Sequence, residues 1–250
     1  MKTLKKFYPI ITTLLISLLQ IPFSIAKSAT NFKWLHSNTS DSKNSNSDLN
    51  IANHDTKSVY DSLHLNLAGL DKKAFEFAET GLLKLKEQGR IMNDSIISII
   101  DFSQPSSNKR FYILDLKNYK MKFNTYVAHG RNSGNIWANS FSNQPRSFKS
   151  SLGFYITHES YNGNKGYSLK LEGIESGINN NADKRAIVVH GANYVNGIIV
   201  NKQGRIGRSE GCPAVPTNEA KPIINFIKDG TCLFIYNPDP SYLHRSAMLN

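Results

Sequence analysis

The polar and apolar positions of residues 58–95 repeat with the period of an α-helix. Val59, Leu63 and Leu67 share one face of a first segment. In a second segment Asp71 is placed to cap the helix and Gly89 to end it. The pattern predicts two helices that form a small helical subdomain over 57–95. The apolar positions of the second helix are Ala74, Phe77, Ala78, Leu82 and Leu85.

Downstream the pattern changes to short apolar runs rich in β-branched and aromatic residues, separated by Gly, Asn and Ser. Such runs are typical of strands. One further helix is expected over about 219–228, with Pro222 in its first turn. These features predict a mostly β domain over 96–240, followed by a tail at 241–250. The expected strands lie in SIISIIDFS, RFYILDL, YKMKFNTYVAHG, LGFYIT, YSLKLEG, AIVVHG and CLFIY.

Residues 1–26 have the organisation of a secretory signal peptide. Lysines come first, an apolar stretch follows from Ile10 to Leu19, and small residues precede an expected cut at Ala26/Lys27. A retained membrane anchor is the alternative, but Gln20 and Pro22 interrupt an apolar run that is already short for a bilayer. We therefore expect export across the inner membrane to the periplasm or cell envelope, with no stable membrane span after cleavage.

Two polar segments connect or precede the predicted elements. Ser, Asn, Asp and Lys dominate residues 27–56, and this composition predicts a flexible tether. Residues 131–151 are rich in turn-forming residues. A loop of this length could cover a cleft, or it could be an irregular surface connection.

The charge of the chain favours an anionic partner. The formal net charge is +11, and removal of the three signal-peptide lysines leaves +8. An exported protein seldom meets nucleic acid, so we expect no nucleic-acid partner. A polyanionic cell envelope fits better, although a generally basic surface without a specific patch is equally compatible with this composition.

Two stretches carry candidate chemistry. AIVVHGANYV ends a buried strand at His190, and GRSEGCPAVP places Cys212 in a turn of small residues. A thiol is a weak nucleophile until a neighbouring imidazole or N–H dipoles lower its pKa. His190 could accept the thiol proton, and Gly211 would allow a bend whose successive N–H groups form an oxyanion hole. The spacing alone occurs by chance in many chains.

Cys212 has two other interpretations. An exported chain meets oxidising conditions, so Cys212 could pair with Cys232, and the pair would mask the nucleophile. Cys212 could also be a small buried residue without chemical importance. Cys232 lies in the apolar run CLFIY and is itself expected to be buried.

The order of these motifs resembles a known family. A strand-end His-Gly followed by S-x-G-C is similar to the L,D-transpeptidase catalytic domain, which has the YkuD-like fold. Further stretches resemble the murein L,D-transpeptidase catalytic-domain-like branch, over about 96–236. The resemblance implies a mostly β sandwich or barrel with a small N-terminal helical subdomain and one C-terminal helix. The stretches are VAHG (127–130), SSLGFYIT (150–157), GYSLKLEG (166–173), HGANYV (190–195) and GRSEGCPAVP (207–216).

The resemblance implies a cysteine acyltransferase. Cys212 would be the nucleophile and His190 its base, oriented by the carbonyl of Gly191. Backbone N–H groups of Gly211 and Cys212 would stabilise the oxyanion, and Ser209 would brace the loop. Cys212 would attack the third, diamino residue of a peptidoglycan stem peptide, expel the terminal D-Ala and form a thioester. An amine of a second stem would then complete a 3→3 cross-link.

The chain departs from the family pattern around the cysteine. Glu210 takes the place of the histidine in Ser-His-Gly-Cys, and its carboxylate would raise the pKa of the thiol unless it points away or pairs with Arg208. Pro213 and Ala214 follow the cysteine, where the family has a polar or basic residue nearby. Recognition of the donor's carboxylates must then come from elsewhere. The candidates are Arg185, Arg205 and Arg208.

Two more histidines are candidates for lining the cleft. His129 precedes a glycine at a strand end and is a candidate substrate-binding residue, and His158 follows a strand beside Tyr161. Each could instead be structural. No CxxC or HExxH motif indicates a metal site, and nothing calls for a cofactor.

The sequence therefore predicts an exported, monomeric L,D-transpeptidase that acts on peptidoglycan. An L,D-carboxypeptidase, which uses water as the acceptor, and a non-catalytic peptidoglycan-binding protein are the alternatives.

Overall fold

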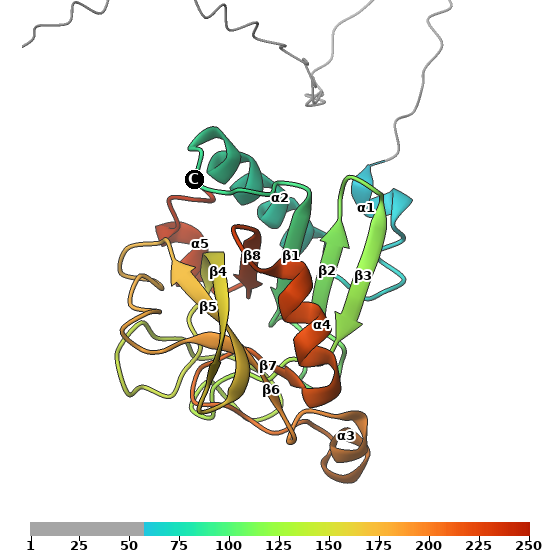
Figure 1. The fold of residues 1–250 in the computed structure, drawn as a ribbon, viewed down its shortest axis with the longest axis vertical. Helices are drawn as coiled ribbons and strands as arrows, with labels where there is room; N and C mark the ends of the chain where they lie inside the picture. The colour runs from blue at the N-terminus through green and yellow to red at the C-terminus, as the bar shows by residue number, and fades with distance from the viewer. Residues whose placement is uncertain (1–57) are drawn as a thin grey trace, which may run out of the picture. The chain divides into compact units, whose positions relative to one another are not determined.

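An eight-stranded sheet organises residues 58–250, the part of the chain that the computed structural model describes (Figure 1). The strands are β1 (Ile96–Asp101), β2 (Phe111–Asp115), β3 (Lys120–Thr125), β4 (Gly153–Gly163), β5 (Gly166–Gly173), β6 (Val188–Ala192), β7 (Ala214–Pro216) and β8 (Cys232–Tyr236). Their order is β3-β2-β1-β8-β4-β5-β6-β7. The prediction of a mostly β fold is confirmed. The expected signal peptide and tether lie outside the described residues.

The two edges of this sheet approach each other beside the cysteine turn. β3 is one edge and β7 the other, and Ala128, just beyond β3, forms an antiparallel bridge with Ala214 of β7. The Ala128 N–H donates to the Ala214 carbonyl at 2.8 Å. A second bridge joins Gly130 to Ser209. The sheet is thereby nearly closed into a barrel, and the cysteine turn lies at the seam.

Helix α2 (Lys72–Glu87) packs on β1 and β8. Asp71 caps it as predicted, because its side chain accepts a hydrogen bond from the Ala74 N–H at 2.9 Å. Gly81 lies so close to the Phe154 ring that a Cβ would stand 2.1 Å from the ring carbons. Gly89 follows the helix with φ of +63°, a left-handed conformation that favours glycine at a helix end.

The first predicted helix is shorter than its spacing suggested. Helix α1 (Val59–Ser62) covers four residues, and turns follow it. Leu67, which the periodicity placed on the apolar face, is 81% exposed, whereas Leu65 and Leu70 are buried. The turns change the direction of the chain, so the helical period no longer describes which residues face the core.

The C-terminal third contains α3 (Gly197–Gln203), α4 (Thr217–Ile227) and α5 (Pro240–Arg245). Helix α4 is the one expected over 219–228, but it begins earlier, so Pro222 lies in its second turn rather than its first. It packs against β6. Helices α3 and α5 are too short to show a periodicity and were not predicted. The expected tail thus contains most of α5, whose Tyr242 is buried. The buried residues of α4 are Ala220, Ile223, Ile224 and Ile227.

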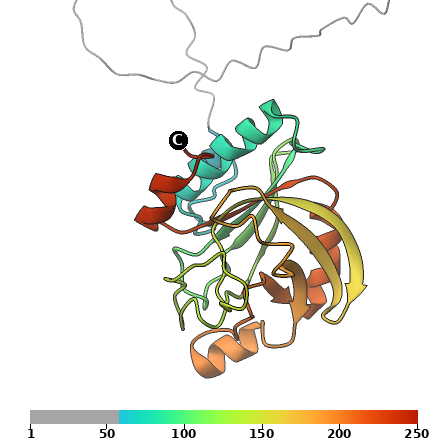
Figure 2. The same cartoon turned by 90° about the vertical axis from the view of Figure 1, so that its left-hand side faces the viewer.

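Strands β4 and β5 form a long, curved hairpin (Figure 2). Its register shifts between Thr157 and Ser160, an irregularity of the kind that bends a strand. β5 also pairs with β6, where Ser168 lies opposite His190. The tip of the hairpin, between Gly163 and Gly166, therefore reaches the same end of the sheet as the candidate histidine.

Candidate active site

A cavity of about 660 Å³ lies between the hairpin tip, β6 and the cysteine turn. His190 and Cys212 both line it. The parallel pairing of β6 with β7 sets His190 opposite Ala214, two residues after the cysteine. Sheet pairing therefore brings together two residues that are far apart in the sequence.

His190 is held in one orientation. The side chain is buried, and the Nδ1–H donates to the carbonyl of Gly191 at 2.9 Å. This bond leaves Nε2 as the proton acceptor of the neutral ring. Burial lowers the pKa of His190, and the nearby charge of Lys165 lowers it further, while the Gly191 carbonyl opposes the shift. The imidazole is thus kept neutral and able to take up a proton.

Cys212 carries a free thiol. Its Sγ–H donates to the carbonyl of Ala186 at 3.5 Å. Burial raises the pKa of the Cys212 thiol, the Val188 N–H and the charges of Lys165 and Arg185 oppose the rise, and Glu210 adds to it. The thiol is therefore protonated at rest and needs a base to become a nucleophile.

The disulfide alternative is not the arrangement found. Cys232 is also free and is fully buried in β8. Burial raises the pKa of Cys232 well above its usual range. It behaves as the small buried residue that the sequence predicts.

Ser209 braces the turn before the cysteine. Its Oγ donates to the carbonyl of Cys212 at 2.6 Å and accepts from the Gly211 N–H at 3.1 Å. Its own backbone is tied to the chain after β3, because the Ser209 N–H donates to the carbonyl of His129 and the Ser209 carbonyl accepts from the Arg131 N–H. The side-chain and backbone bonds together fix the course of the turn.

The expected oxyanion hole needs a correction at Gly211. The Gly211 N–H is directed at Ser209 Oγ and is not free for a ligand. Among residues 58–250 no group accepts a hydrogen bond from the Cys212 N–H, so this donor remains available. Gly211 is required for a different reason: its φ is +126°, and a Cβ would stand 2.8 Å from the carbonyl oxygen of Lys149.

Segment 131–151 is bound to this turn. The Ser150 Oγ donates to the carbonyl of Gly211 at 3.3 Å and accepts from the Gly130 N–H. The Ser150 N–H in turn donates to Ser133 Oγ at 2.8 Å. The segment therefore supports the back of the cysteine turn.

Two of the predicted arginines line the cavity and one does not. Arg185 lines it, and its guanidinium also donates to the Ser142 carbonyl at 2.8 Å. Arg208 lines it and donates to the Gly134 carbonyl at 3.0 Å. Arg205 is not among the lining residues; its guanidinium donates to the carbonyl of its neighbour Ile206. The prediction for Arg205 is wrong because the bend of the chain directs this side chain back onto its own backbone.

His129 is a structural residue, contrary to the prediction. It is fully buried, Arg110 donates to its Nδ1 at 2.8 Å, and its Nε2 contacts the Gly134 carbonyl at 3.3 Å. Burial and the Arg110 charge lower the pKa of His129 to about 3. Its role is to satisfy buried polar groups behind the seam.

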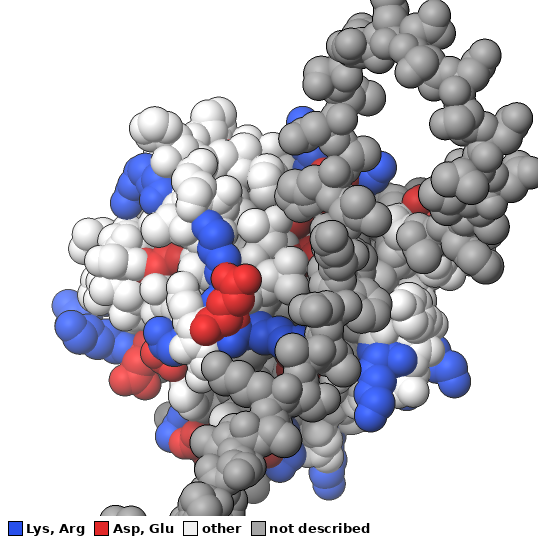
Figure 3. Space-filling view, turned by 90° about the horizontal axis from the view of Figure 1, so that it is seen from above, with Lys and Arg blue, Asp and Glu red and all other residues white. Residues whose placement is uncertain are grey.

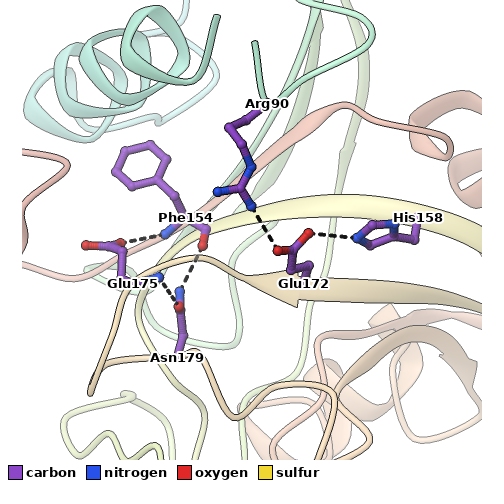
Figure 4. A network of polar contacts seen from close by, with 6 residues as sticks. All are labelled: Arg90, Phe154, His158, Glu172, Glu175 and Asn179. Atoms are coloured by element: carbon purple, nitrogen blue, oxygen red, sulfur yellow. Dashed lines mark hydrogen bonds and ion pairs between the residues drawn. The ribbon is translucent and has the colours of Figure 1, made fainter. Parts of the chain in front are cut away.

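His158 also lies away from the cavity. Its Nε2 contacts Glu172 at 3.0 Å, and Arg90 donates to the other oxygen of the same carboxylate at 2.8 Å (Figure 4). His158 is not a lining residue of the cavity that contains the cysteine. The network instead links the end of the α2 region to the β4–β5 hairpin.

Several residues that line the cavity were not predicted as site residues from the sequence. Arg131, at the start of the long loop, lies over the Phe148 ring at 4.0 Å. Lys165 comes from the hairpin tip. The two glycines of GNKG (163–166) indicate the turn of a hairpin in the sequence. The position of that turn beside His190 depends on sheet pairing, which the sequence pattern does not show. The missed lining residues include Arg131, Tyr161, Lys165 and Tyr194.

The Lys and Arg side chains do not form a continuous basic patch on the face that Figure 3 draws. On the face drawn in Figure 3, the described Lys and Arg side chains lie among Asp, Glu and uncharged residues. The cavity is different, because its lining includes four cationic side chains and one carboxylate. Within residues 58–250, no group of three or more His, Cys, Asp or Glu residues could hold a metal ion.

The sequence matches a model of the L,D-transpeptidase catalytic domain over residues 66–236. The chain therefore belongs to the L,D-transpeptidase catalytic domain family. The matched region includes α2, β1–β8 and the candidate residues His190 and Cys212. No curated protein matches this sequence.

Several solved structures are similar at a distance. An L,D-transpeptidase from Mycobacterium smegmatis is 11% identical, with a TM-score of 0.35 over 57% of this chain and 59% of that one. The helical cell shape determining protein Pgp2 from Campylobacter jejuni is 14% identical, with a TM-score of 0.38 over 57% and 48%. A fused Zn-dependent amidase/peptidase/peptidoglycan-binding domain-containing protein from Clostridium acetobutylicum is 17% identical, with a TM-score of 0.34 over 62% and 61%. The chain spans less than two thirds of each.

Proposed function

We propose that the chain is an exported L,D-transpeptidase, which acylates Cys212 with a peptidoglycan stem peptide and transfers the acyl group to an amine. One observation carries the proposal: a free thiol and a neutral, oriented imidazole line the same cavity. Membership of the family adds the reaction class.

The donor step uses this pair of residues. The thiol hydrogen leaves the Ala186 carbonyl, and His190 Nε2 accepts the proton. The Cys212 Sγ then forms a bond to the carbonyl carbon of the third stem residue, and the C–N bond to the terminal D-Ala breaks. The leaving nitrogen takes the proton from His190, so a thioester and free D-Ala result. The free Cys212 N–H is the donor for the developing oxyanion.

The cationic lining suits a donor that carries carboxylates. Lys165 makes no ion pair or hydrogen bond among residues 58–250, so its ammonium is available to a ligand. Arg185 is partly committed to backbone carbonyls, and it acts as a fixed positive charge in the wall. A peptidoglycan stem has carboxylates at its D-Glu and diamino residues, and these are the groups that such a wall would attract.

The proposed location rests on the first 26 residues. Their charge and apolar pattern is that of a signal peptide, and they lie outside the described part of the chain. Within residues 58–250 no helix is long and apolar enough to cross a membrane. A periplasmic or cell-envelope enzyme is the proposal that fits this pattern.

Intact-mass spectrometry after incubation with a carbapenem tests the chemistry. We expect one covalent adduct per chain, because a strained β-lactam carbonyl acylates an activated thiol. The adduct should be absent in Cys212→Ala and retained in Cys232→Ala, the matched variant at the buried cysteine. The same spectrum reads the N-terminus of protein recovered from the periplasm, which we expect at Lys27.

Other results would change the proposal. No adduct on a protein whose Cys212 still titrates as a free thiol would contradict acyl transfer and favour a peptidoglycan-binding role. Where the adduct forms, the products of incubating the protein with stem tetrapeptides show whether the acceptor is an amine or water. Cross-linked dimers would support a transpeptidase, and tripeptides alone would show that water is the acceptor.

A further inference from the structure

Glu210 is the single carboxylate in the lining of the cavity that contains Cys212. The other charged lining residues are cationic: Arg131, Lys165, Arg185 and Arg208. This set attracts the carboxylates of a donor, but it repels the ammonium of an acceptor amine. An acceptor that arrives as an ammonium would bind more tightly where a carboxylate offsets this repulsion.

The Glu210 carboxylate is free to bind such a charge. Its side chain is 63% exposed, and its nearest cation is Arg131, with 3.9 Å between Arg131 Nη2 and Glu210 Oε1. That distance is too long for a hydrogen bond. No group among residues 58–250 donates a hydrogen bond to Glu210, and the expected pairing with Arg208 is not formed.

Arg131 also makes contacts other than that with Glu210. Its guanidinium lies 4.0 Å from the centroid of the Phe148 ring, and its backbone N–H is bound to the Ser209 carbonyl. The turn carrying Glu210 is fixed in turn by Ser209 and Gly211. The carboxylate is therefore placed two residues from the nucleophile, and its one ion pair among residues 58–250 is the long contact with Arg131.

We propose that Glu210 is a specificity-determining residue that binds the ammonium of the acceptor and so favours an amine over water. The inference rests on the proposed function, because it concerns the second half of that reaction. The ammonium bound by Glu210 releases one proton to solvent, and the amine nitrogen forms a bond to the thioester carbon. The C–S bond breaks, and a second proton passes through His190 to the departing sulfur.

The test compares two nucleophiles on the same acyl-enzyme. The mature protein is incubated with a stem tetrapeptide as donor, with either a tripeptide that carries a diamino residue or hydroxylamine as acceptor. The tripeptide amine is cationic near neutral pH, whereas hydroxylamine is uncharged. For Glu210→Gln we expect the rate constant for the tripeptide to fall roughly 3- to 5-fold, as for loss of an exposed ion pair. Reaction with hydroxylamine should change less than about 2-fold.

Two variants control the experiment. Glu210→Asp keeps the charge and should retain most of the tripeptide rate. Glu76→Gln removes the same charge from α2, where Glu76 also lies 3.9 Å from a cation, Lys72, and should leave both rates unchanged. Added salt should shrink the difference between wild type and Glu210→Gln, because salt screens exposed charges.

The outcomes separate the two proposals. A wild-type protein that forms no thioester with the donor overturns the proposed function, and this inference with it. A thioester that forms while Glu210→Gln slows the tripeptide and hydroxylamine equally, or slows neither, overturns the inference alone. The equal loss would show that Glu210 merely holds the turn or Arg131.

Discussion

The Cys212 thiol and the His190 ring both lie in surroundings that disfavour their charged forms. Burial raises the pKa of the thiol and lowers the pKa of the imidazole. A resting thiolate–imidazolium pair is therefore not the expected state, and the proton moves only as the substrate carbonyl is attacked. Lys165 is the group that acts on both, since its positive charge lowers both pKa values.

The pH dependence of Cys212 alkylation by iodoacetamide checks this description. Because the pKa of the thiol is raised, the rate should keep rising with pH beyond the range in which a free thiol levels off. Lys165→Gln should shift the profile to higher pH and slow the reaction roughly 2- to 5-fold near neutral pH. Lys202→Gln, on the exposed side of α3, is the matched control and should not move the profile. A flat profile from mildly acid pH upward would contradict the neutral pair.

At the scale of elements, the contact between α2 and the sheet depends on the absence of one side chain. Gly81 lies against the Phe154 ring, and Phe154 stacks on Phe234 with 4.1 Å between ring centroids. The ring cannot retreat into a neighbour that it already contacts. The helix therefore approaches the sheet more closely than alanine would allow.

Gly81→Ala should lower the free energy of unfolding by about 1–3 kcal/mol through overpacking, although alanine has the higher helix propensity. Chemical denaturation measures the change. Thr80→Ala, on the exposed side of the same helix, should stay within about 0.5 kcal/mol of wild type. A stabilised Gly81→Ala protein would show that helix propensity outweighs the contact.

Across the whole molecule, Glu175 joins segments that are distant in the sequence. Its buried carboxylate accepts hydrogen bonds from the Phe154 N–H of β4 at 2.8 Å, from the Tyr242 hydroxyl at 3.2 Å, and from Ser246 (Figure 4 shows the Phe154 bond). Asn179 completes the arrangement, since its Nδ2 donates to the Phe154 carbonyl at 2.9 Å. The C-terminal helix is thereby fastened to the middle of the sheet.

Burial raises the pKa of Glu175, so the folded state binds this proton more tightly than the unfolded state. The cost of the buried charge is present at neutral pH and is lost as the pH falls through the folded pKa toward the ordinary carboxyl range. Wild type should therefore gain stability relative to Glu175→Gln on mild acidification, as measured by urea unfolding. Glu87→Gln, at an exposed position, controls for the loss of a charge. Parallel curves for wild type and Glu175→Gln would contradict a raised pKa of Glu175 in the folded state.

Local chemistry explains which features could be predicted. The Asp71 cap, the Gly89 helix end and the pairing of a strand-end histidine with a cysteine turn each depend on neighbouring residues or on an ordered motif. The predicted length of the first helix was wrong because turns follow α1 and interrupt the helical period. The expectation for His129 was wrong because its burial and its bond to Arg110 depend on a segment distant in the sequence. The expectation for Arg205 was wrong because its guanidinium bonds to the carbonyl of its neighbour Ile206, a side-chain direction that the residue pattern does not specify.

The sequence by itself determined the mostly β class, the long helix and the family motif, because period, caps and turn residues act over a few positions. Only the tertiary structure decided the composition of the cavity. Strand pairing places the hairpin tip with Lys165 and the loop residue Arg131 beside the cysteine turn. His129 is buried and does not line the cavity. Backbone bonds to His129 and Arg131, which are distant in the sequence, hold the turn that carries Glu210 beside this cavity. There Glu210 forms only a long ion pair with Arg131.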